Sequence, residues 1–192
     1  MTDDRGLQGK VAIVTGGGAA GDGIGNGRAM AMSLARAGTR VLVIDRKEEL
    51  ALRTVKMIEA EGGTAAAFAA DVTDESQCRA MVEAAVTRFG RLDFLGNNVG
   101  VDSRGTVVEE SLAAWQRLML INVDTMFLAS KYAIPAMIDT AKGGAIVNIS
   151  SISALRPRGL TAYSTSKGAV IALTKAMAVD HGPQGVRVNC IA

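Results

Sequence analysis

A tyrosine and a lysine that could transfer a proton stand four residues apart in the stretch YSTSK, as Tyr163 and Lys167. Residues at this spacing project from the same face of a helix. An ammonium group near a phenol stabilises the phenolate and lowers the pKa of a phenol from about 10 towards neutral pH, so that it can act as a general acid or base. The spacing alone also fits a half-buried tyrosine beside a solvated lysine.

Polar side chains follow three apolar stretches that read as strands. Ser150 and Ser151 end AIVNISS, Asn97 and Asn98 end FLGNN, and Asp71 ends TAAAFAAD. The carboxyl ends of parallel strands border a ligand crevice. There, either serine could hydrogen-bond a substrate oxygen, the asparagines could hold the backbone of the crevice floor, and the aspartate could contact an adenine ring. Equally, the serines and asparagines could be turn residues, and the aspartate could mark a helix entry.

Seven of the 22 glycines of the chain fall within twelve positions, from Gly16 to Gly27. They join a predicted strand directly to a predicted helix, where free N–H groups and the absence of side chains let a pyrophosphate approach the backbone. Asp45 ends the next predicted strand, where it can bind the ribose hydroxyls of NAD and would repel the 2′-phosphate of NADP. Arg46 would offset part of that repulsion, so the sequence favours NAD over NADP without deciding between them.

The elements that must position these residues alternate along the chain. Short apolar runs predict six strands, at residues 10–15, 40–45, 64–71, 92–97, 145–150 and 186–191. Segments between them predict five helices, at residues 27–38, 47–61, 74–89, 111–139 and 162–181. Strands that are apolar on both faces and separated by helices form a parallel sheet covered on both sides. The sequence therefore predicts a doubly wound α/β fold of Rossmann type, as one domain over residues 1–192.

Composition excludes several classes of function. The net charge of +2 comes without a basic run, so nucleic-acid binding is not predicted. No apolar run approaches the roughly 20 residues of a membrane span, and the first residues lack the profile of a signal peptide. Cys78 and Cys190 lie far apart, which predicts reduced thiols and a cytoplasmic location. His181 is the only histidine, so no metal site is predicted, although the count leaves a carboxylate-only site open.

The motifs occur in a recognisable order along the whole chain: the glycine stretch, DVTD, NNVG, IVNISS, YSTSK and GVRVNCIA. In this the chain resembles the classical short-chain dehydrogenase/reductase family. The resemblance implies hydride transfer between NAD(H) and a secondary alcohol or ketone. It implies that Tyr163 is the general acid/base, and that Lys167 stabilises its phenolate and binds the nicotinamide ribose. It further implies that Ser151, with Ser150 as the alternative, orients the substrate oxygen, and that Asn122 supports a proton relay.

The resemblance also implies a set of cofactor-binding residues, which surround a dinucleotide. These are Gly16, Gly23, Ile24, Gly25, Gly27, Asp45, Arg46, Asp71, Val72, Asn98 and Gly100, together with Tyr163 and Lys167. The glycine loop departs from the family pattern, in which three residues separate Thr-Gly from Gly-x-Gly. Here the loop is longer by three residues if GIG (23–25) takes that role, or by five if GNG (25–27) does.

The resemblance is incomplete beyond GVRVNCIA, because family members continue into a substrate loop and a further strand that these residues lack. The alternative function is therefore a truncated, non-catalytic dinucleotide-binding module. The helices predicted at 111–139 and 162–181 are apolar over more of their circumference than one sheet contact can cover. We therefore expect a homodimer or homotetramer through these helices. The identity of the substrate, expected to be a small alcohol or ketone, and the direction of the reaction are not predicted.

Overall fold

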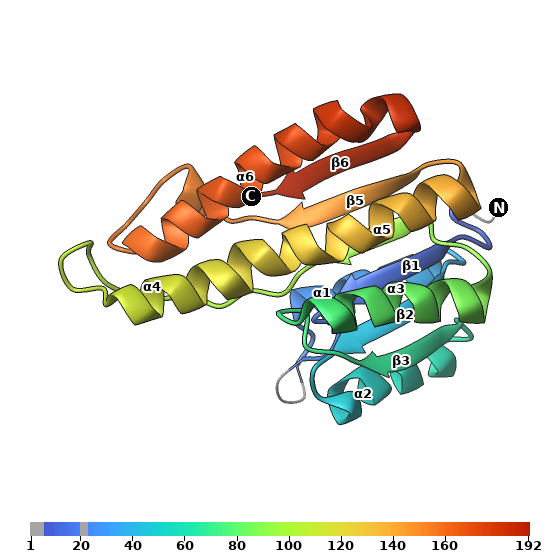
Figure 1. Ribbon diagram of the computed structural model, residues 1–192. Helices are drawn as coiled ribbons and strands as arrows, with labels where there is room; N and C mark the ends of the chain where they lie inside the picture. Colours follow the sequence, from blue (N-terminus) through green and yellow to red (C-terminus); the bar gives the residue numbers. More distant parts are fainter. Residues whose placement is uncertain (1–5, 20–22) are drawn as a thin grey trace.

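The computed structural model describes residues 6–19 and 23–192. In this part of the chain six strands form one parallel sheet in the order β3-β2-β1-β4-β5-β6 (Figure 1). The strands are β1 (Val11–Thr15), β2 (Arg40–Asp45), β3 (Ala65–Ala69), β4 (Phe94–Asn97), β5 (Gly144–Ile149) and β6 (Val186–Ile191). The strand order reverses between β1 and β4, and such a switch point is where ligands bind in open α/β sheets.

Helices cover both faces of the sheet, as predicted. On one face pack α1 (Asn26–Arg36) and α2 (Glu48–Ala60); on the other pack α3 (Glu75–Phe89), α5 (Thr125–Ala141) and α6 (Thr161–His181) (Figure 1). Right-handed crossovers place the helices in this way, because the chain moves outward from β1 in one direction and outward from β4 in the other. The predicted doubly wound α/β fold is confirmed.

The central strand β1 shows why an apolar run predicts a buried strand. All five of its residues are buried. Ala12 and Val14 pack in the cluster under α1 and α2, whereas Val11 and Ile13 pack in the cluster on the opposite face. Each fully buried valine or isoleucine side chain contributes about 1.5–3 kcal/mol by leaving water. A strand that is covered on both faces therefore has no polar alternation in its sequence.

The long helix predicted at 111–139 is present over residues 112–141, but it contains a turn that the sequence did not predict. Its parts are α4 (Leu112–Met119), a π-helical turn η1 (Leu120–Asp124) and α5. Within η1 the side chain of Asn122 hydrogen-bonds both the N–H and the C=O of Val101, which lies outside the helix. A π-turn adds one residue to a turn. Apolar periodicity carries no sign of such a turn, because the pattern continues on either side of it.

Two predicted strands are shorter than expected. The strand predicted at 64–71 ends at Ala69, because Asp71 turns the chain by accepting hydrogen bonds from both the N–H and the hydroxyl of Thr73. The strand predicted at 92–97 begins at Phe94, since the N–H of Leu92 donates to the hydroxyl of Thr140. The other predicted boundaries, apart from those of the long helix, agree to within two residues, and those of β2 and β6 match at both ends.

Two short 3-10 turns complete the described elements, η2 (Ile152–Ala154) before α6 and η3 (Gly182–Gln184) after it. Within residues 6–19 and 23–192, no helix is long and apolar enough to cross a lipid bilayer. Cys78 of α3 is buried and Cys190 of β6 is half-buried, and both are free thiols.

Candidate active site

The glycine loop joins β1 to α1, as predicted. Its member Gly21 lies outside the described residues. The helix α1 begins at Asn26 with Gly25 as its N-cap, so the GNG triplet starts the helix and GIG precedes it. A Cβ on Gly27 would lie 2.1 Å from the carbonyl oxygen of Gly16 and 2.5 Å from Nδ2 of Asn98. Glycine at position 27 therefore lets α1 approach the ends of β1 and β4 directly.

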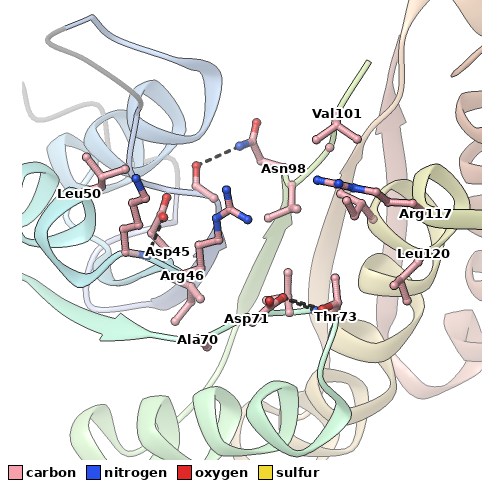
Figure 2. Close-up of a pocket in the computed structure, with 17 residues that line it drawn as sticks. Asp45, Arg46, Leu50, Ala70, Asp71, Thr73, Asn98, Val101, Arg117 and Leu120 are labelled. Atoms are coloured by element: carbon pink, nitrogen blue, oxygen red, sulfur yellow. Dashed lines mark hydrogen bonds between the residues drawn. The ribbon is translucent and has the colours of Figure 1, made fainter. Parts of the chain in front are cut away.

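A cleft of about 600 Å³ opens at the carboxyl ends of β1, β2 and β4 (Figure 2). Its volume lies within the range of small-molecule and cofactor sites. Seven of the residues predicted to bind the cofactor line it: Gly16, Asp45, Arg46, Asp71, Val72, Asn98 and Gly100. Among the described residues, six others predicted for the cofactor are not part of this lining: Gly23, Ile24, Gly25, Gly27, Tyr163 and Lys167. The side chain of Ile24 is 63% exposed.

Asp45 is the last residue of β2 and lies at one end of the cleft. Its Oδ1 accepts a hydrogen bond from the N–H of Lys47 at 3.1 Å. A Cβ on Gly18 would lie 2.6 Å from Oδ2 of the same carboxylate. Glycine at position 18 thus leaves room for the carboxylate at the rim of the glycine loop. The neighbouring Arg46 extends into the cleft (Figure 2).

Asp71 lines the cleft rather than starting α3. Its Oδ1 accepts hydrogen bonds from Thr73, and its own N–H donates to Gln77. The cap of α3 is Asp74, whose carboxylate accepts the N–H groups of Ser76 and Gln77. These hydrogen bonds, that with the hydroxyl of Ser76 foremost, hold the pKa of the Asp74 carboxyl below its usual value. The aspartate that marks the helix entry is therefore Asp74, which leaves Asp71 at the cleft.

The two asparagines after β4 have different roles in the fold. Asn98 joins β4 to β1, because its N–H donates to the Thr15 hydroxyl and its Nδ2 donates to the carbonyl of Gly16. Asn97 is buried and instead donates to side chains on α5 and β5, Ser130 and Asn148. Both asparagines were predicted to hold the backbone at the cleft. Asn98 does so, but Asn97 does not.

Tyr163 and Lys167 lie on α6, with Nζ of the lysine 5.8 Å from the centroid of the tyrosine ring. Tyr163 is half-buried, but Lys167 is only 3% exposed, so the alternative of a solvated lysine does not hold. The lysine Nζ donates to the carbonyl of Ile149, the last residue of β5, at 2.8 Å. Burial lowers the pKa of Lys167 from 10.5 to about 8, because the charged form loses its water.

The two candidate serines are distinguished by what their hydroxyls bind. Ser150 is buried, and its hydroxyl donates to the carbonyl of Lys167 in α6 at 2.8 Å. Ser151 is half-buried and caps η2, where its hydroxyl oxygen accepts the N–H of Ser153. Within the described part of the chain, the Ser151 hydroxyl donates its proton to no hydrogen-bond acceptor. Ser151 therefore keeps a donor for another molecule, whereas the donor of Ser150 is used within the fold.

Asn122 and Lys167 meet beside Gly100. Asn122 is fully buried; its Oδ1 accepts the N–H of Val101 at 2.8 Å, and its Nδ2 donates to the hydroxyl of Ser166 at 3.0 Å. A Cβ on Gly100 would lie 3.1 Å from Nζ of Lys167 and 3.3 Å from Oδ1 of Asn122. The glycine keeps this space open. The structure thus brings three of the predicted residues together from the β4 loop, η1 and α6.

The sequence analysis missed an arginine that lines the cleft. Arg117 extends into the cleft from α4, on the side opposite Arg46 (Figure 2). Leu120 and Ile121 line the cleft next to it. The spacing 117, 120 and 121 marks one face of a helix. This spacing is visible in the sequence, where the apolar excess of the helix predicted an oligomer contact instead.

These residues fit a dinucleotide. Side chains of both signs line the cleft: the acids Asp45 and Asp71, and the bases Arg46, Lys47 and Arg117. The open N-terminus of α1 lies beside it, where Gly16 and Gly27 leave no side chain between helix and strand. The described residues contain no group of three or more His, Cys, Asp or Glu placed to hold a metal ion. The strand order, the glycine-rich first turn and the acid after β2 define a dinucleotide-binding domain of Rossmann type.

Comparisons with known proteins identify the family. The family model for short chain dehydrogenases matches residues 10–192. 2-(S)-Hydroxypropyl-CoM dehydrogenase 3 of Xanthobacter autotrophicus is 39% identical over 96% of this chain and 71% of its own length. Cyclohexanol dehydrogenase of an Acinetobacter species is 38% identical over 95% of this chain and 71% of its own length. The chain therefore belongs to the short-chain dehydrogenase family and is an oxidoreductase of that family.

A solved structure agrees with this assignment. The crystal structure of a Burkholderia xenovorans protein assigned to the short-chain dehydrogenases/reductases matches this chain with a TM-score of 0.92 and 40% sequence identity. The match covers 96% of this chain and 73% of that one. The fold and the order of the motifs are thus those of the family.

Proposed function

We propose that the protein transfers a hydride between NAD(H) and a secondary alcohol or ketone, with Tyr163 as the general acid/base. The observation that carries the proposal is the burial of Lys167 beside the Tyr163 ring, at the edge of a cleft of cofactor size. The names of the relatives support the substrate class, since two of them are a cyclohexanol dehydrogenase and a meso-2,3-butanediol dehydrogenase.

The residues of this chain would handle the proton and hold the substrate. The nicotinamide supplies the hydride chemistry when it is bound. The Tyr163 hydroxyl would exchange a proton with the substrate oxygen, and the charge of Lys167 would stabilise the phenolate. The Ser151 hydroxyl would donate to the same substrate oxygen. Asn122 would keep the Val101 backbone and the α6 side chain of Ser166 in place around this group.

We propose NAD as the cofactor rather than NADP. The carboxylate of Asp45 is fixed at the cleft by the N–H of Lys47, where it can accept the ribose hydroxyls and would oppose a phosphate. Arg46 and Arg117 lie in the same cleft and weaken this opposition. Titration of the purified protein with NADH and with NADPH tests the choice. Tighter binding of NADPH would overturn it.

The proton-transfer role is tested with Tyr163→Phe. We expect this variant to bind NADH as the wild type does and to lose turnover by at least about 10²-fold, because only the hydroxyl is removed. NADH absorbance, followed with a panel of cyclic and linear secondary alcohols, measures the rate. An unchanged rate would remove Tyr163 from the mechanism. Binding of NADH without turnover of any alcohol or ketone would favour a non-catalytic dinucleotide-binding module.

We also propose that residues 1–192 include one NAD(P)-binding unit that works in a homo-oligomer in the cytoplasm. The free thiols of Cys78 and Cys190 support a reducing compartment. Exposed apolar residues on the helices of one face support an oligomer, among them Phe127 on α5 and Val179 on α6.

A further inference from the structure

A buried arginine at the start of α1 has no acidic partner among the described residues. Arg28 is the third residue of α1, and it is 2% exposed. Its Nη2 is buried and has no hydrogen-bond partner in that part of the chain. Removing a charge from water without a counter-charge is costly. A side chain in such a position reduces stability, which suggests that it serves another purpose.

The remaining nitrogens of Arg28 hold both ends of the glycine loop. Nη1 donates to the carbonyl of Gly23 at 2.6 Å, near the end of the loop. Nε donates to the hydroxyl of Thr54 at 3.0 Å, and that hydroxyl donates to the carbonyl of Gly17 at 2.8 Å, at the start of the loop. Thr54 is fully buried on α2. One guanidinium thus ties two loop segments to a neighbouring helix.

This loop needs an external restraint. Five of the eight residues 16–23 are glycine, the residue with the greatest backbone freedom to lose on ordering. A binding loop that is free to move loses part of its affinity to the entropy of ordering, and restraint before binding recovers that part. The hydrogen bonds from Arg28 and Thr54 provide such a restraint on both sides of the loop.

We propose that Arg28 is a positioning residue for the diphosphate of the cofactor, because it clamps Gly23 directly and Gly17 through Thr54. This inference rests on the proposed function. Arg28 acts through the backbone of the loop, and its side chain is not part of the cleft lining. Its loss should therefore weaken cofactor binding while leaving the chemical step in the bound complex nearly intact.

The test uses NADH as the probe and measures its dissociation constant by fluorescence. We expect Arg28→Met to weaken NADH binding about tenfold, the loss of a hydrogen bond to a charged group, with kcat within about twofold of the wild type. The matched control is Arg36→Met. Arg36 also joins α1 to the end of α2, through Glu61, but it is exposed, and the structure shows its guanidinium bound to Glu61 and to none of the described loop residues. The control should bind NADH as the wild type does.

A second pair of variants separates the clamp from the charge. Thr54→Val keeps the charge of Arg28 and breaks the link to Gly17, so NADH binding should weaken severalfold; Thr54→Ser keeps the hydroxyl and should bind normally. The effects of Arg28→Met and Thr54→Val should not add, because the two side chains form one relay. Since Thr54→Val tests the relay independently, the proposal stays testable even if Arg28→Met does not fold.

Each outcome has one meaning. If the wild type binds neither NADH nor NADPH, the proposed function fails and this inference fails with it. If the wild type binds NADH and Arg28→Met binds it equally well, only the inference is overturned. Normal binding by Thr54→Val would overturn the clamp, and so would an equal loss in Arg36→Met, because the effect would then be one of helix docking.

Discussion

Lys167 is a buried lysine that lies beside Tyr163, where the proposed reaction needs a positive charge. Its one hydrogen bond in the described residues is to the carbonyl of Ile149, which offsets only part of the lost hydration. The folded protein thus carries a group that lowers its stability at neutral pH. Such a site is typical of function rather than of folding, because charged groups are buried chiefly where their charge is used.

This environment predicts how stability depends on pH. The pKa of Lys167 is 10.5 when free and about 8 in the fold. Between these pH values the unfolded chain holds a proton that the folded protein lacks, so the destabilisation present below pH 8 is relieved as the pH rises. Relative to Lys167→Met, the free energy of unfolding of the wild type should therefore rise by up to about 1.4 kcal/mol per pH unit in this window.

Urea unfolding of the wild type and Lys167→Met at pH 7.5, 8.5 and 9.5 measures the difference. The variant should be as stable as the wild type or more stable at the lowest pH, while its turnover falls at least about 10²-fold. A difference in stability that does not change with pH would mean that the lysine is not held with a lowered pKa. Lys175→Met, on an exposed position of the same helix, is the control and should show no such trend.

At the scale of elements, the π-helical turn η1 positions the centre of the site. It lies between α4 and α5 in one continuous helical stretch, and its Asn122 side chain binds the backbone of Val101. The helix α5, which follows η1, runs without interruption from Thr125 to Ala141, although it contains Pro135. Asn122 thereby joins the β4 loop at Val101 to α6 at Ser166, next to Gly100.

Removing the side chain of Asn122 should loosen this arrangement. Asn122→Ala leaves the N–H and C=O of Val101 without their partner, so we expect a loss of about 1–3 kcal/mol in the free energy of unfolding. Urea denaturation measures it. Asn148→Ala, which removes a buried amide one strand away from the cleft, is the comparison. Both variants should lose stability, but only Asn122→Ala should also lose turnover. Equal turnover in the two would assign Asn122 a purely structural role.

The sequence predicts elements better than it predicts contacts between them. The apolar runs of β1 and β2 are long and uninterrupted, and so they predict a buried parallel sheet. The π-turn depends on a hydrogen bond from Asn122 to a residue 21 positions away, which no local pattern encodes. The role of Arg28 could not be predicted for the same reason, because its partner Thr54 lies on another helix. Candidate site residues could be found by type and position, but not the partners that hold them.

At the scale of the whole molecule, the cleft lies at the switch point between two halves of the sheet, β3-β2-β1 and β4-β5-β6. The core is shared by both halves, because the cluster under α3, α5 and α6 includes Val11 of β1 as well as Leu95 of β4. Asn98 links the halves by binding Thr15 and Gly16. A dinucleotide that spans the switch point would contact both halves. The residues that line the cleft lie far apart in the sequence, so the site forms only when the sheet is complete.

The outer face of α6 predicts how copies of the chain associate. Ala172, Ala176 and Val179 follow one another at helical spacing and are exposed, next to the half-buried Gly168. Small residues on a helix face allow another helix to approach closely, and a two-fold axis would pair this face with itself. We therefore expect a dimer or tetramer whose interface includes α6. Ala172→Arg should disrupt it, because a long charged side chain would occupy the line of closest approach.

Light scattering after size-exclusion chromatography measures the mass of the particle. The wild type should give two or four times the mass of the chain, and Ala172→Arg a smaller multiple, with the same far-UV circular dichroism. The matched control is Ala60→Arg, an exposed alanine at the end of α2 on the opposite face of the sheet. It should leave the mass unchanged. If Ala172→Arg also leaves it unchanged, α6 is not part of the interface, and its exposed small residues carry no association between copies.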